Sequence, residues 1–257
     1  MSGASRGLLG ALATPVIERL RPYVRTLRYG YRTARGFFGR FPRECTVCGH
    51  RGRFFAYGND LRLGVMIDAL CPRCLSLGRH RLLVLCDREK QLFAKRSILH
   101  IAPEHGMRRY ILSCGPSEYV TGDLKDSKAD LKIDIEHIDL PDERFELVYC
   151  SHVLEHVNDA LAIPELWRIV KPNGLLIAMM PVIEGWSSSF EDASKLGSVE
   201  SRILYFGQHD HVRYFGSDVR ERLAAPGFRV EEYTAVEPYV SLHGLARGEK
   251  VFLCRKA

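Results

Sequence analysis

The sequence of 257 residues lacks long hydrophobic runs, internal repeats and low-complexity segments. Its longest uncharged apolar stretches, Gly7–Ile17 and Gly174–Ile183, are shorter than the roughly 20 residues of a membrane-spanning helix, so a transmembrane protein is excluded. The apolar residues Gly7–Gly10 are too few for the core of a signal peptide, and we expect no secretion. Because 46% of the residues are hydrophobic and 26% are charged, the chain can bury a sizeable core.

Lysine and acidic residues are scarce in residues 1–43, which contain nine arginines, no lysine and a single acid, Glu18. This segment therefore carries a charge of +8, and because the whole chain carries +6, the remainder carries −2. Proteins that follow a nucleic-acid backbone need basic residues across the binding face. The near-neutral remainder therefore counts against nucleic acid as a partner.

Residues 1–43 also show the pattern of an amphipathic helix. Apolar residues recur at alternating steps of four and three, at Leu20, Val24, Leu27, Tyr31, Ala34 and Phe38. Arginines follow the same steps one residue later, at Arg21, Arg25, Arg28, Arg32 and Arg35. Such a basic helical tail is typical of peripheral contact with an anionic membrane. The alternatives are packing of its apolar face against protein and an RNA contact.

The eight cysteines fall into two groups. Four form two C-x-x-C pairs separated by 22 residues, namely Cys45, Cys48, Cys71 and Cys74, and the other four are scattered singly. Two such pairs can hold one zinc ion with four thiolates, which leaves no open position, so the zinc is structural. We expect a zinc module with a linking helix over residues 44–95. Metal-binding and buried thiols indicate a reducing compartment, and we expect a cytoplasmic protein.

Residues 96–257 alternate strand-like and helix-like runs. The strand-like runs are 97–102, 118–123, 131–135, 145–151, 174–181, 228–234 and 250–254. Helix-like runs fall between them, notably over 158–170 and 217–225, and the turn Pro172–Gly174 leads into the fifth strand. This alternation predicts an α/β fold with a Rossmann-like, doubly wound, seven-stranded sheet that binds ligands at the carboxyl ends of its strands.

The block FELVYCSHVLEHVNDALAIPELWRIVKPNGLLIAMMPV over residues 145–182 resembles the class I S-adenosylmethionine-dependent methyltransferases of type 11. In that family a hydrophobic strand leads to the residues VLEHV, and a helix that ends near a K-P-G-G turn precedes the next strand. Residues 211–233 resemble the stretch that leads into the family's sixth strand, so the resemblance covers nearly all of 96–257. With the cysteine pairs in front, the chain is similar to a bacterial subgroup associated with polysaccharide or glycolipid assembly.

The resemblance implies a glycine-rich loop after the first strand, where the cofactor lies against bare backbone. Of the usual three glycines only Gly106 remains, and Ala102 and Glu104 stand in place of the others. We expect the Glu104 carboxylate to meet the ammonium group of S-adenosylmethionine. The alternative is an ordinary strand-to-helix turn.

Further cofactor contacts follow from the same resemblance. Asp123 ends the second strand, 17 residues beyond Gly106, and is expected to accept hydrogen bonds from the ribose hydroxyls. Asp134 after the third strand is expected to contact adenine, with Ile135 on the ring and Glu136 as the alternative to Asp134.

The fourth strand is followed by Ser151 and His152, which we expect beside the sulfonium, and by Glu155 and His156, which we assign to the next turn. Transfer to a hydroxyl also needs a base, and a histidine suits this role near neutral pH. The candidates are His209, which we favour, with His211 and His152. Residues 184–207 are long for a connection and predict a lid over the substrate or, alternatively, a disordered insertion.

We therefore expect an enzyme that transfers a methyl group from S-adenosylmethionine to a hydroxyl or carbon of a sugar, glycan or glycolipid. Its basic tail would keep it at the inner face of an anionic membrane. One alternative is an RNA methyltransferase with a zinc module in front. The other is a non-catalytic scaffold with a methyltransferase-like fold, which the loss of two glycines motivates.

Overall fold

The computed structural model describes residues 38–58 and 66–257 and eight positions of the N-terminal segment, namely Leu20, Tyr23, Val24, Thr26, Leu27, Gly30, Tyr31 and Ala34. Leu20, Val24 and Leu27 are helical, and each is more than half exposed. The five arginines of the predicted basic stripe lie outside the described residues, so this stripe stays a prediction. Among the residues that are described, none of the helices has the length and apolar character needed to cross a membrane.

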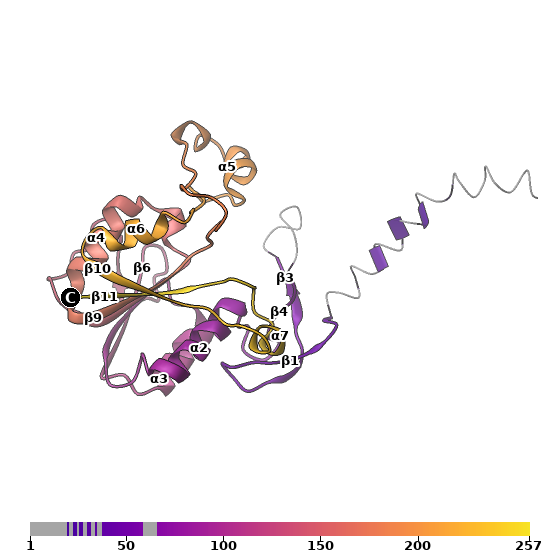
Figure 1. The fold of residues 1–257 in the computed structure, drawn as a ribbon, viewed down its shortest axis with the longest axis horizontal. Coiled ribbons are helices and arrows are strands. Elements are labelled where there is room, and N and C mark those ends of the chain that lie inside the picture. The colour runs from indigo at the N-terminus through magenta and orange to yellow at the C-terminus, as the bar shows by residue number, and fades with distance from the viewer. Residues whose placement is uncertain are drawn as a thin grey trace, which may run out of the picture.

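A seven-stranded sheet with the order β10-β11-β9-β8-β5-β6-β7 forms the centre of the molecule (Figure 1). Its strands are β5 (Ser97–Ile101), β6 (Glu118–Asp123), β7 (Leu131–Lys132), β8 (Phe145–Ser151), β9 (Val170–Met179), β10 (Phe228–Tyr233) and β11 (Val251–Lys256). The strands β5 to β9 run parallel, whereas β11 is antiparallel to both of its neighbours. The predicted doubly wound α/β sheet is confirmed.

Helices cover both faces of the sheet, with α2 and α3 on one side and α4 and α6 on the other (Figure 1). The helices are α2 (Gly78–Lys90), α3 (His105–Ser113), α4 (Asp159–Ile169), α5 (Val199–Phe206), α6 (Val219–Ala224) and α7 (Tyr239–His243), and two short 3-10 helices are η1 (Leu154–His156) and η2 (Ala193–Lys195). Successive strand residues point to opposite faces, so Ile98 packs in the α2 core and Leu99 in the α4 core. Two apolar cores therefore hold the sheet.

The strand β9 begins at Val170, four residues before the predicted start. Its pairing with β8 shifts register between Phe145↔Val170 and Leu147↔Leu175, so the predicted turn is a bulge inside the strand. Asn173 in this bulge has a φ of 60°, a left-handed conformation that asparagine tolerates better than most residues.

The helix expected to link the zinc module to the sheet is α2, which ends at Lys90 rather than near residue 95. Gln91 adopts a left-handed conformation, and the Asp87 carboxylate accepts hydrogen bonds from the backbone N–H groups of Leu92 and Phe93. These bonds direct the chain away from the helix axis. Since α2 shares an apolar core with the sheet, it is a layer of the fold as well as a link.

Two small antiparallel sheets precede α2 and carry the cysteine turns. They consist of β1 (Pro42–Glu44) with β2 (Arg51–Arg53), and of β3 (Phe55–Tyr57) with β4 (Met66–Leu70). The helix α7 near the C-terminus packs against β1 (Figure 1). The segment around α7 therefore packs on this module, whereas the chain ends in β11 of the central sheet.

Candidate functional sites

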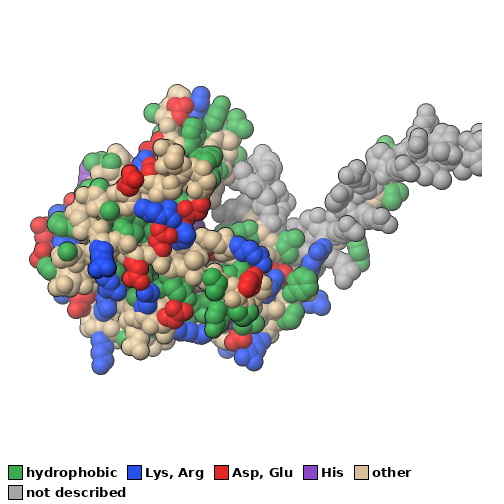
Figure 2. All heavy atoms as spheres, in the orientation of Figure 1, with side chains coloured by type: hydrophobic (Ala, Val, Ile, Leu, Met, Phe, Trp, Pro, Cys, Tyr) green, Lys and Arg blue, Asp and Glu red, His purple; other side chains and the backbone are tan. Residues whose placement is uncertain are grey.

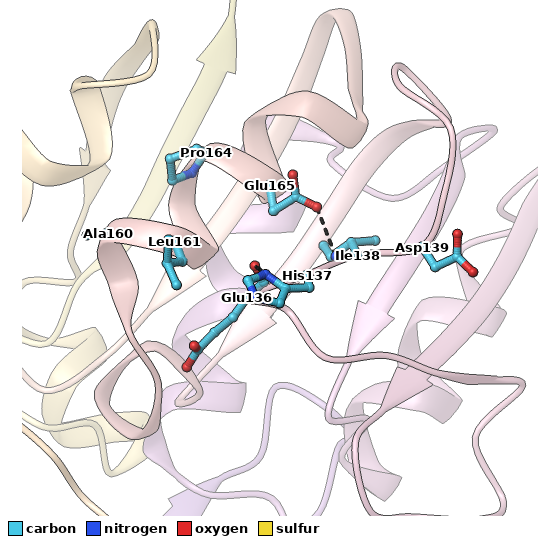
Figure 3. Close-up of a pocket in the computed structure, with 8 residues that line it drawn as sticks. All are labelled: Glu136, His137, Ile138, Asp139, Ala160, Leu161, Pro164 and Glu165. Atoms are coloured by element: carbon cyan, nitrogen blue, oxygen red, sulfur yellow. Dashed lines mark hydrogen bonds between the residues drawn. The ribbon is translucent and has the colours of Figure 1, made fainter.

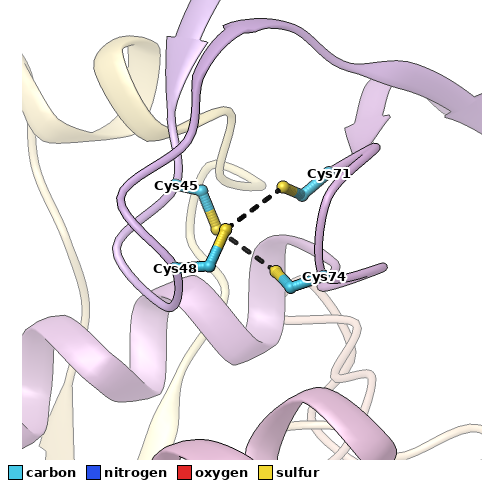
Figure 4. Close-up of side chains that lie close together, drawn as sticks. All are labelled: Cys45, Cys48, Cys71 and Cys74. Atoms are coloured by element: carbon cyan, nitrogen blue, oxygen red, sulfur yellow. Dashed lines mark hydrogen bonds between the residues drawn. The ribbon is translucent and has the colours of Figure 1, made fainter.

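The four cysteines of the two C-x-x-C pairs converge on one point (Figure 4). The Sγ atoms of Cys45 and Cys74 lie 3.6 Å apart, and those of Cys48 and Cys71 lie 3.7 Å apart. Sulfurs bound at about 2.3 Å in a tetrahedron around zinc are roughly 3.8 Å apart, so the cluster is compatible with zinc. The contact with Cys74 and burial raise the pKa of the Cys45 thiol to about 12, whereas the contact with Cys45 lowers the pKa of Cys74.

The two cysteine turns have the same backbone shape. The N–H of Gly49 donates to the carbonyl of Cys45, and the N–H of Leu75 donates to that of Cys71, both at 2.9 Å. Gly49 and Leu75 have φ values of 71° and 58°. Leucine is unusual in this left-handed position, where glycine has no Cβ to clash. Both cysteine pairs therefore form this turn, although only the first pair is followed by the glycine that indicates it in the sequence.

Arg81 of α2 ties the module to the rest of the protein. Its side chain has no exposed surface and donates hydrogen bonds to four backbone carbonyls, those of Ala69, Ser76, His243 and Gly244. Its guanidinium also lies 4.6 Å from the ring centroid of Phe54. Burial lowers the pKa of Arg81 to about 10, so it stays charged at neutral pH. One buried cation therefore joins the cysteine module, α2 and the C-terminal segment.

A cavity of about 580 Å³ opens at the carboxyl ends of β5, β6, β7 and β8, where the fold predicts a ligand. Five of the predicted site residues line it, namely Ala102, Asp123, Asp134, Ile135 and His152. Ile101 and Ile133 add apolar surface, and Leu196 and Arg202 come from the segment 184–207. This segment contains η2 and α5, so it forms one wall of the cavity, as a lid would.

The two aspartates of the cavity are held by their own turns. Oδ1 of Asp123 accepts hydrogen bonds from the N–H groups of Lys125 and Asp126, at 2.7 and 2.8 Å, which leaves Oδ2 without a partner among the described residues. Oδ1 of Asp134 accepts from the N–H of Glu136 at 3.0 Å. The Glu136 carboxylate is engaged elsewhere, because it accepts from the backbone N–H that begins α4. Asp134, and not Glu136, therefore lines the cavity.

The loop after β5 begins with a residue in the left-handed conformation. Ala102 has a φ of 48°, a conformation in which a residue with a Cβ is strained. Its N–H donates to the carbonyl of Gly122 at 2.8 Å. A Cβ at Gly122 would lie 2.6 Å from the side chain of Ile133, so a glycine at this place in β6 lets Ile133 pack against the strand at the floor of the cavity. Ala102 therefore adopts a conformation that favours glycine although it carries a Cβ.

The second half of this loop faces the cysteine module instead of the cavity. The Glu104 carboxylate lies 2.8 Å from Nε2 of His80 and 3.3 Å from Nε of Arg79. Burial would raise the pKa of Glu104, but the imidazoles of His100 and His80 hold it well below its usual value. A Cβ at Gly106 would lie 3.2 Å from the carbonyl oxygen of Cys74. Neither Glu104 nor Gly106 lines the cavity, and the contact of Glu104 with a cofactor stays a prediction.

The wall after β8 carries the residues expected beside the reacting atoms. His152 has a φ of 54°, and its N–H donates to the carbonyl of Met179 at 2.7 Å. Its Nδ1 lies 3.2 Å from Oε1 of Glu155, which is buried. Burial would raise the pKa of Glu155, but His152 lowers it. Ser151, which precedes His152 in the sequence, is buried and is not part of the cavity lining. Its Oγ has no hydrogen-bond partner among the described residues.

The other two candidate bases lie in the segment before β10. The side chain of His209 is 69% exposed and does not line the cavity. His211 is buried, its ring centroid lies 4.7 Å from that of His156, and burial lowers its pKa. Glu155 and His156, expected only in the next turn, lie in the 3-10 helix η1, and His156 contacts His211. The spacing His152, Glu155, His156 was the available signal, because it puts three polar side chains in one helical turn.

A second hollow of about 570 Å³ lies between α4 and the residues after β7, with Glu136, His137 and Glu165 on its rim (Figure 3). The Glu165 carboxylate accepts a hydrogen bond from the N–H of Ile138 and binds Arg168. The carboxylates of Glu136 and Glu165 are therefore engaged in fixing α4 to the loop, and no strand of the sheet ends in this hollow. We assign no chemistry to this hollow.

Comparisons with known proteins agree with this geometry. Residues 98–178, which span β5 to the end of β9, match a family described as a methyltransferase domain. The match covers less than half of the chain, and no curated protein matches the sequence. The topology, the cavity and the family match together support a methyltransferase domain with a Rossmann-like fold.

Solved structures similar to this chain are distant. One is an S-adenosylmethionine-dependent methyltransferase from Mesorhizobium loti, with 14% identity and a TM-score of 0.48 over 68% of this chain and 98% of that one. Another is a 1,6-didemethyltoxoflavin-N1-methyltransferase from Burkholderia thailandensis, with 12% identity and a TM-score of 0.45 over 68% of this chain and 76% of that one. Likenesses at this level carry no argument about the substrate.

Proposed function

We propose that the protein is an S-adenosylmethionine-dependent methyltransferase with a structural zinc ion bound by its four clustered cysteines. The observation that carries this proposal is the cavity at the carboxyl edge of the sheet, into which Asp123 brings a carboxylate oxygen that no described residue engages. A volume of about 580 Å³ is typical of sites for small molecules and cofactors. The family match over residues 98–178 supports the same function.

The residues around the cavity fit this cofactor. Asp123 would accept hydrogen bonds from both ribose hydroxyls, since its turn already fixes the carboxylate. Asp134 would accept from the adenine amino group, with Ile135 against the ring. Ala102 brings a nearly bare backbone to the edge of the cavity, which lets a ligand approach closely. The side chain of Arg202 closes the opposite wall from α5.

The acceptor in this proposal is a hydroxyl or carbon of a sugar, glycan or glycolipid. When bound, S-adenosylmethionine would supply a methyl group activated by its positively charged sulfur. The wall after β8 would align the acceptor with it. His152 lines the cavity, so its imidazole would take the proton that a hydroxyl acceptor loses. This assignment prefers His152 to the exposed His209.

Binding of S-adenosylmethionine to the zinc-loaded protein, measured by titration calorimetry, tests the proposal. Asp123→Ala should weaken binding by about 1–3 kcal/mol, because the ribose hydroxyls lose a charged acceptor. Asp123→Asn keeps an oxygen for the turn and should fall between that variant and the unmodified protein. Asp126→Ala is the matched control, since Asp126 lies in the same turn outside the cavity lining. An affinity that Asp123→Ala leaves unchanged would place the cofactor elsewhere.

The same titration separates the two alternative functions. A non-catalytic scaffold would bind no S-adenosylmethionine. An RNA methyltransferase would bind RNA with a steep dependence on salt, because phosphate contacts release counterions. Basic and acidic side chains are interspersed on the face in Figure 2, which does not favour an extended phosphate-binding surface.

The acceptor and the membrane contact need cellular measurements. Mass spectrometry of cell-envelope glycans, with and without the active protein, should show a difference of one methyl group. Peripheral membrane binding through residues 1–43 is supported by the exposure of Leu20, Val24 and Leu27. Sedimentation with anionic vesicles should therefore capture the full chain but not a variant that starts at residue 38. Equal capture of both would contradict the proposed membrane contact.

A further inference from the structure

Three metal-ligating side chains meet beside the proposed cofactor cavity, outside the cysteine cluster: Glu155, His156 and His211. One ligand atom from each lies within 4.8 Å of those of the other two. Glu155 is 2% exposed and His211 is 4% exposed. Neither carboxylate oxygen of Glu155 has a hydrogen bond among the described residues, and the same holds for Nδ1 of His211. A buried carboxylate without donors is costly, so this arrangement calls for a cation.

Backbone contacts hold the three side chains in place. The short helix η1 presents Glu155 and His156 next to each other, and the N–H of Val212 donates to the carbonyl of Glu155 at 3.0 Å, which fixes the neighbouring His211. Nδ1 of His156 lies 3.3 Å from the backbone oxygen of Asp210. Such an outer hydrogen bond orients a metal-ligating imidazole and leaves its second nitrogen available. The rings of His156 and His211 are nearly perpendicular, at 83°.

Glu155 and His211 of this cluster are buried in the protein, and the cluster reaches the cavity through His156. His156 and Asp210 belong to the lining of the cavity, as does His152, whose Nδ1 lies 3.2 Å from Glu155. Nδ1 of His152 and Oε1 of Glu155 are close but do not form a hydrogen bond of good geometry. Both carboxylate oxygens of Glu155 therefore remain available to a cation.

We propose that Glu155, His156 and His211 bind a divalent transition-metal ion of the zinc type, whose remaining coordination position faces the cavity. Two imidazoles and one carboxylate are a ligand set that such ions accept, and three protein ligands with an open position are typical of catalytic zinc sites. Ligand atoms on one zinc lie roughly 3.3 Å apart, so small side-chain rotations would close the site. The ion would hold an oxygen of the acceptor. This role rests on the proposed methyl transfer, whereas the binding of the metal is independent of it.

Metal content tests the site directly. A chelator first removes bound metal from the full chain, which is then loaded with zinc. After unbound metal is removed, elemental mass spectrometry measures the zinc content per chain. We expect two zinc ions per chain for the unmodified protein, and one for Glu155→Gln and for His211→Asn. The exposed neighbour provides the control, because His209→Asn should keep two. Affinity for the second zinc should fall by more than the roughly 10–100-fold that loss of an outer partner costs.

Cobalt in place of zinc identifies which site is filled. A cobalt ion among the four cysteines gives sulfur-to-metal charge-transfer absorption, whereas one bound by Glu155, His156 and His211 does not. Glu155→Gln should keep the charge-transfer band and lose the second cobalt, which also shows that the variant is folded. If Glu155→Gln does not fold, His156→Asn, at a partly exposed position, replaces it.

Two results would overturn the site: a single zinc in the unmodified protein, or two zinc ions in folded Glu155→Gln or His156→Asn. Binding of S-adenosylmethionine is measured on the same samples. Cofactor binding with a single zinc would reject the second metal site and keep the proposed function. Two zinc ions without cofactor binding would do the reverse.

Discussion

The cysteine cluster and the cluster of Glu155, His156 and His211 gather metal ligands in two different ways. In the first, two short turns of one shape supply four sulfurs, two of them from buried cysteines, which would leave no open position on a zinc ion. In the second, a short helix and a loop more than 50 residues later supply three ligands beside a cavity. A complete ligand set stabilises structure, whereas an incomplete one leaves room for a substrate. We therefore expect the cysteine cluster to serve stability and the second cluster, beside the cavity, to serve chemistry.

The loop after β5 connects these two regions. Its beginning, at Ala102, lines the cavity, and its end, at Glu104 and Gly106, packs against the cysteine module. The module therefore supports the rear of the loop on which the proposed cofactor would lie. If this division is correct, changes at the module should reduce stability more than they change the cavity.

The largest effect is expected from Cys71→Ser. Loss of one of four ligands should release the zinc, which contributes about 10–16 kcal/mol in isolated zinc-finger peptides, so the module should unfold. Limited proteolysis should then cut within residues 44–77, and zinc content should fall. Cys114→Ser is the control, since this cysteine lies outside the cluster. Resistance to proteolysis equal to that of the control would show that the module folds without its metal.

A smaller loss of stability is expected from Arg81→Met. The substitution removes the side-chain donor from four backbone carbonyls, of which that of Ser76 still accepts from the N–H of Cys71, and the free energy of unfolding should fall by about 3–5 kcal/mol. Arg88→Met on the same helix removes one hydrogen bond at an exposed position and should cost about 1 kcal/mol or less. Urea unfolding measures both variants. Similar losses would mean that Arg81 does not join the module to the fold.

The smallest effect, and a pH-dependent one, is expected from Glu104→Gln. The pKa of Glu104 is lowered in the folded state, so its ionised form stabilises the protein above the unfolded pKa of about 4.5. This contribution, about 1–3 kcal/mol, is lost as the pH falls through the lowered folded value. The difference in unfolding free energy between the two proteins should therefore be present at neutral pH and shrink in acid. Glu143→Gln, an exposed site, should show no such trend.

Local patterns predicted the elements well and their ends less well. The strand-like runs at Ser97, Glu118 and Phe145 match β5, β6 and β8, because alternation of strands and helices is written in short stretches of sequence. The predicted start of β9 was wrong, because Pro172 and Gly174 indicate a turn. In the structure, pairing with β8 continues the strand through a bulge at these residues. In these places tertiary pairing overrides local preference.

The residues of the candidate site also differ in whether local sequence or tertiary packing decides their positions. Asp123 and Asp134 could be placed from sequence, because the carboxyl ends of parallel strands share one edge of the sheet. The direction of Glu104 could not, since it depends on His80 and Arg79 from α2, which approach only when the module docks. The meeting of His211 with Glu155 and His156 also required the fold, because more than 50 residues separate them in the sequence.

The amino-acid order by itself determined the doubly wound sheet, the paired cysteine turns and the aspartates at the strand ends, since each follows from spacing along one or two neighbouring elements. Only the tertiary structure decided which polar side chains are buried together. Packing of α2 and the cysteine turns against the loop after β5 drew Glu104 away from the cavity. Packing of the loop before β10 against η1 brought His211 to Glu155, because close packing fixes partners that sequence distance leaves open.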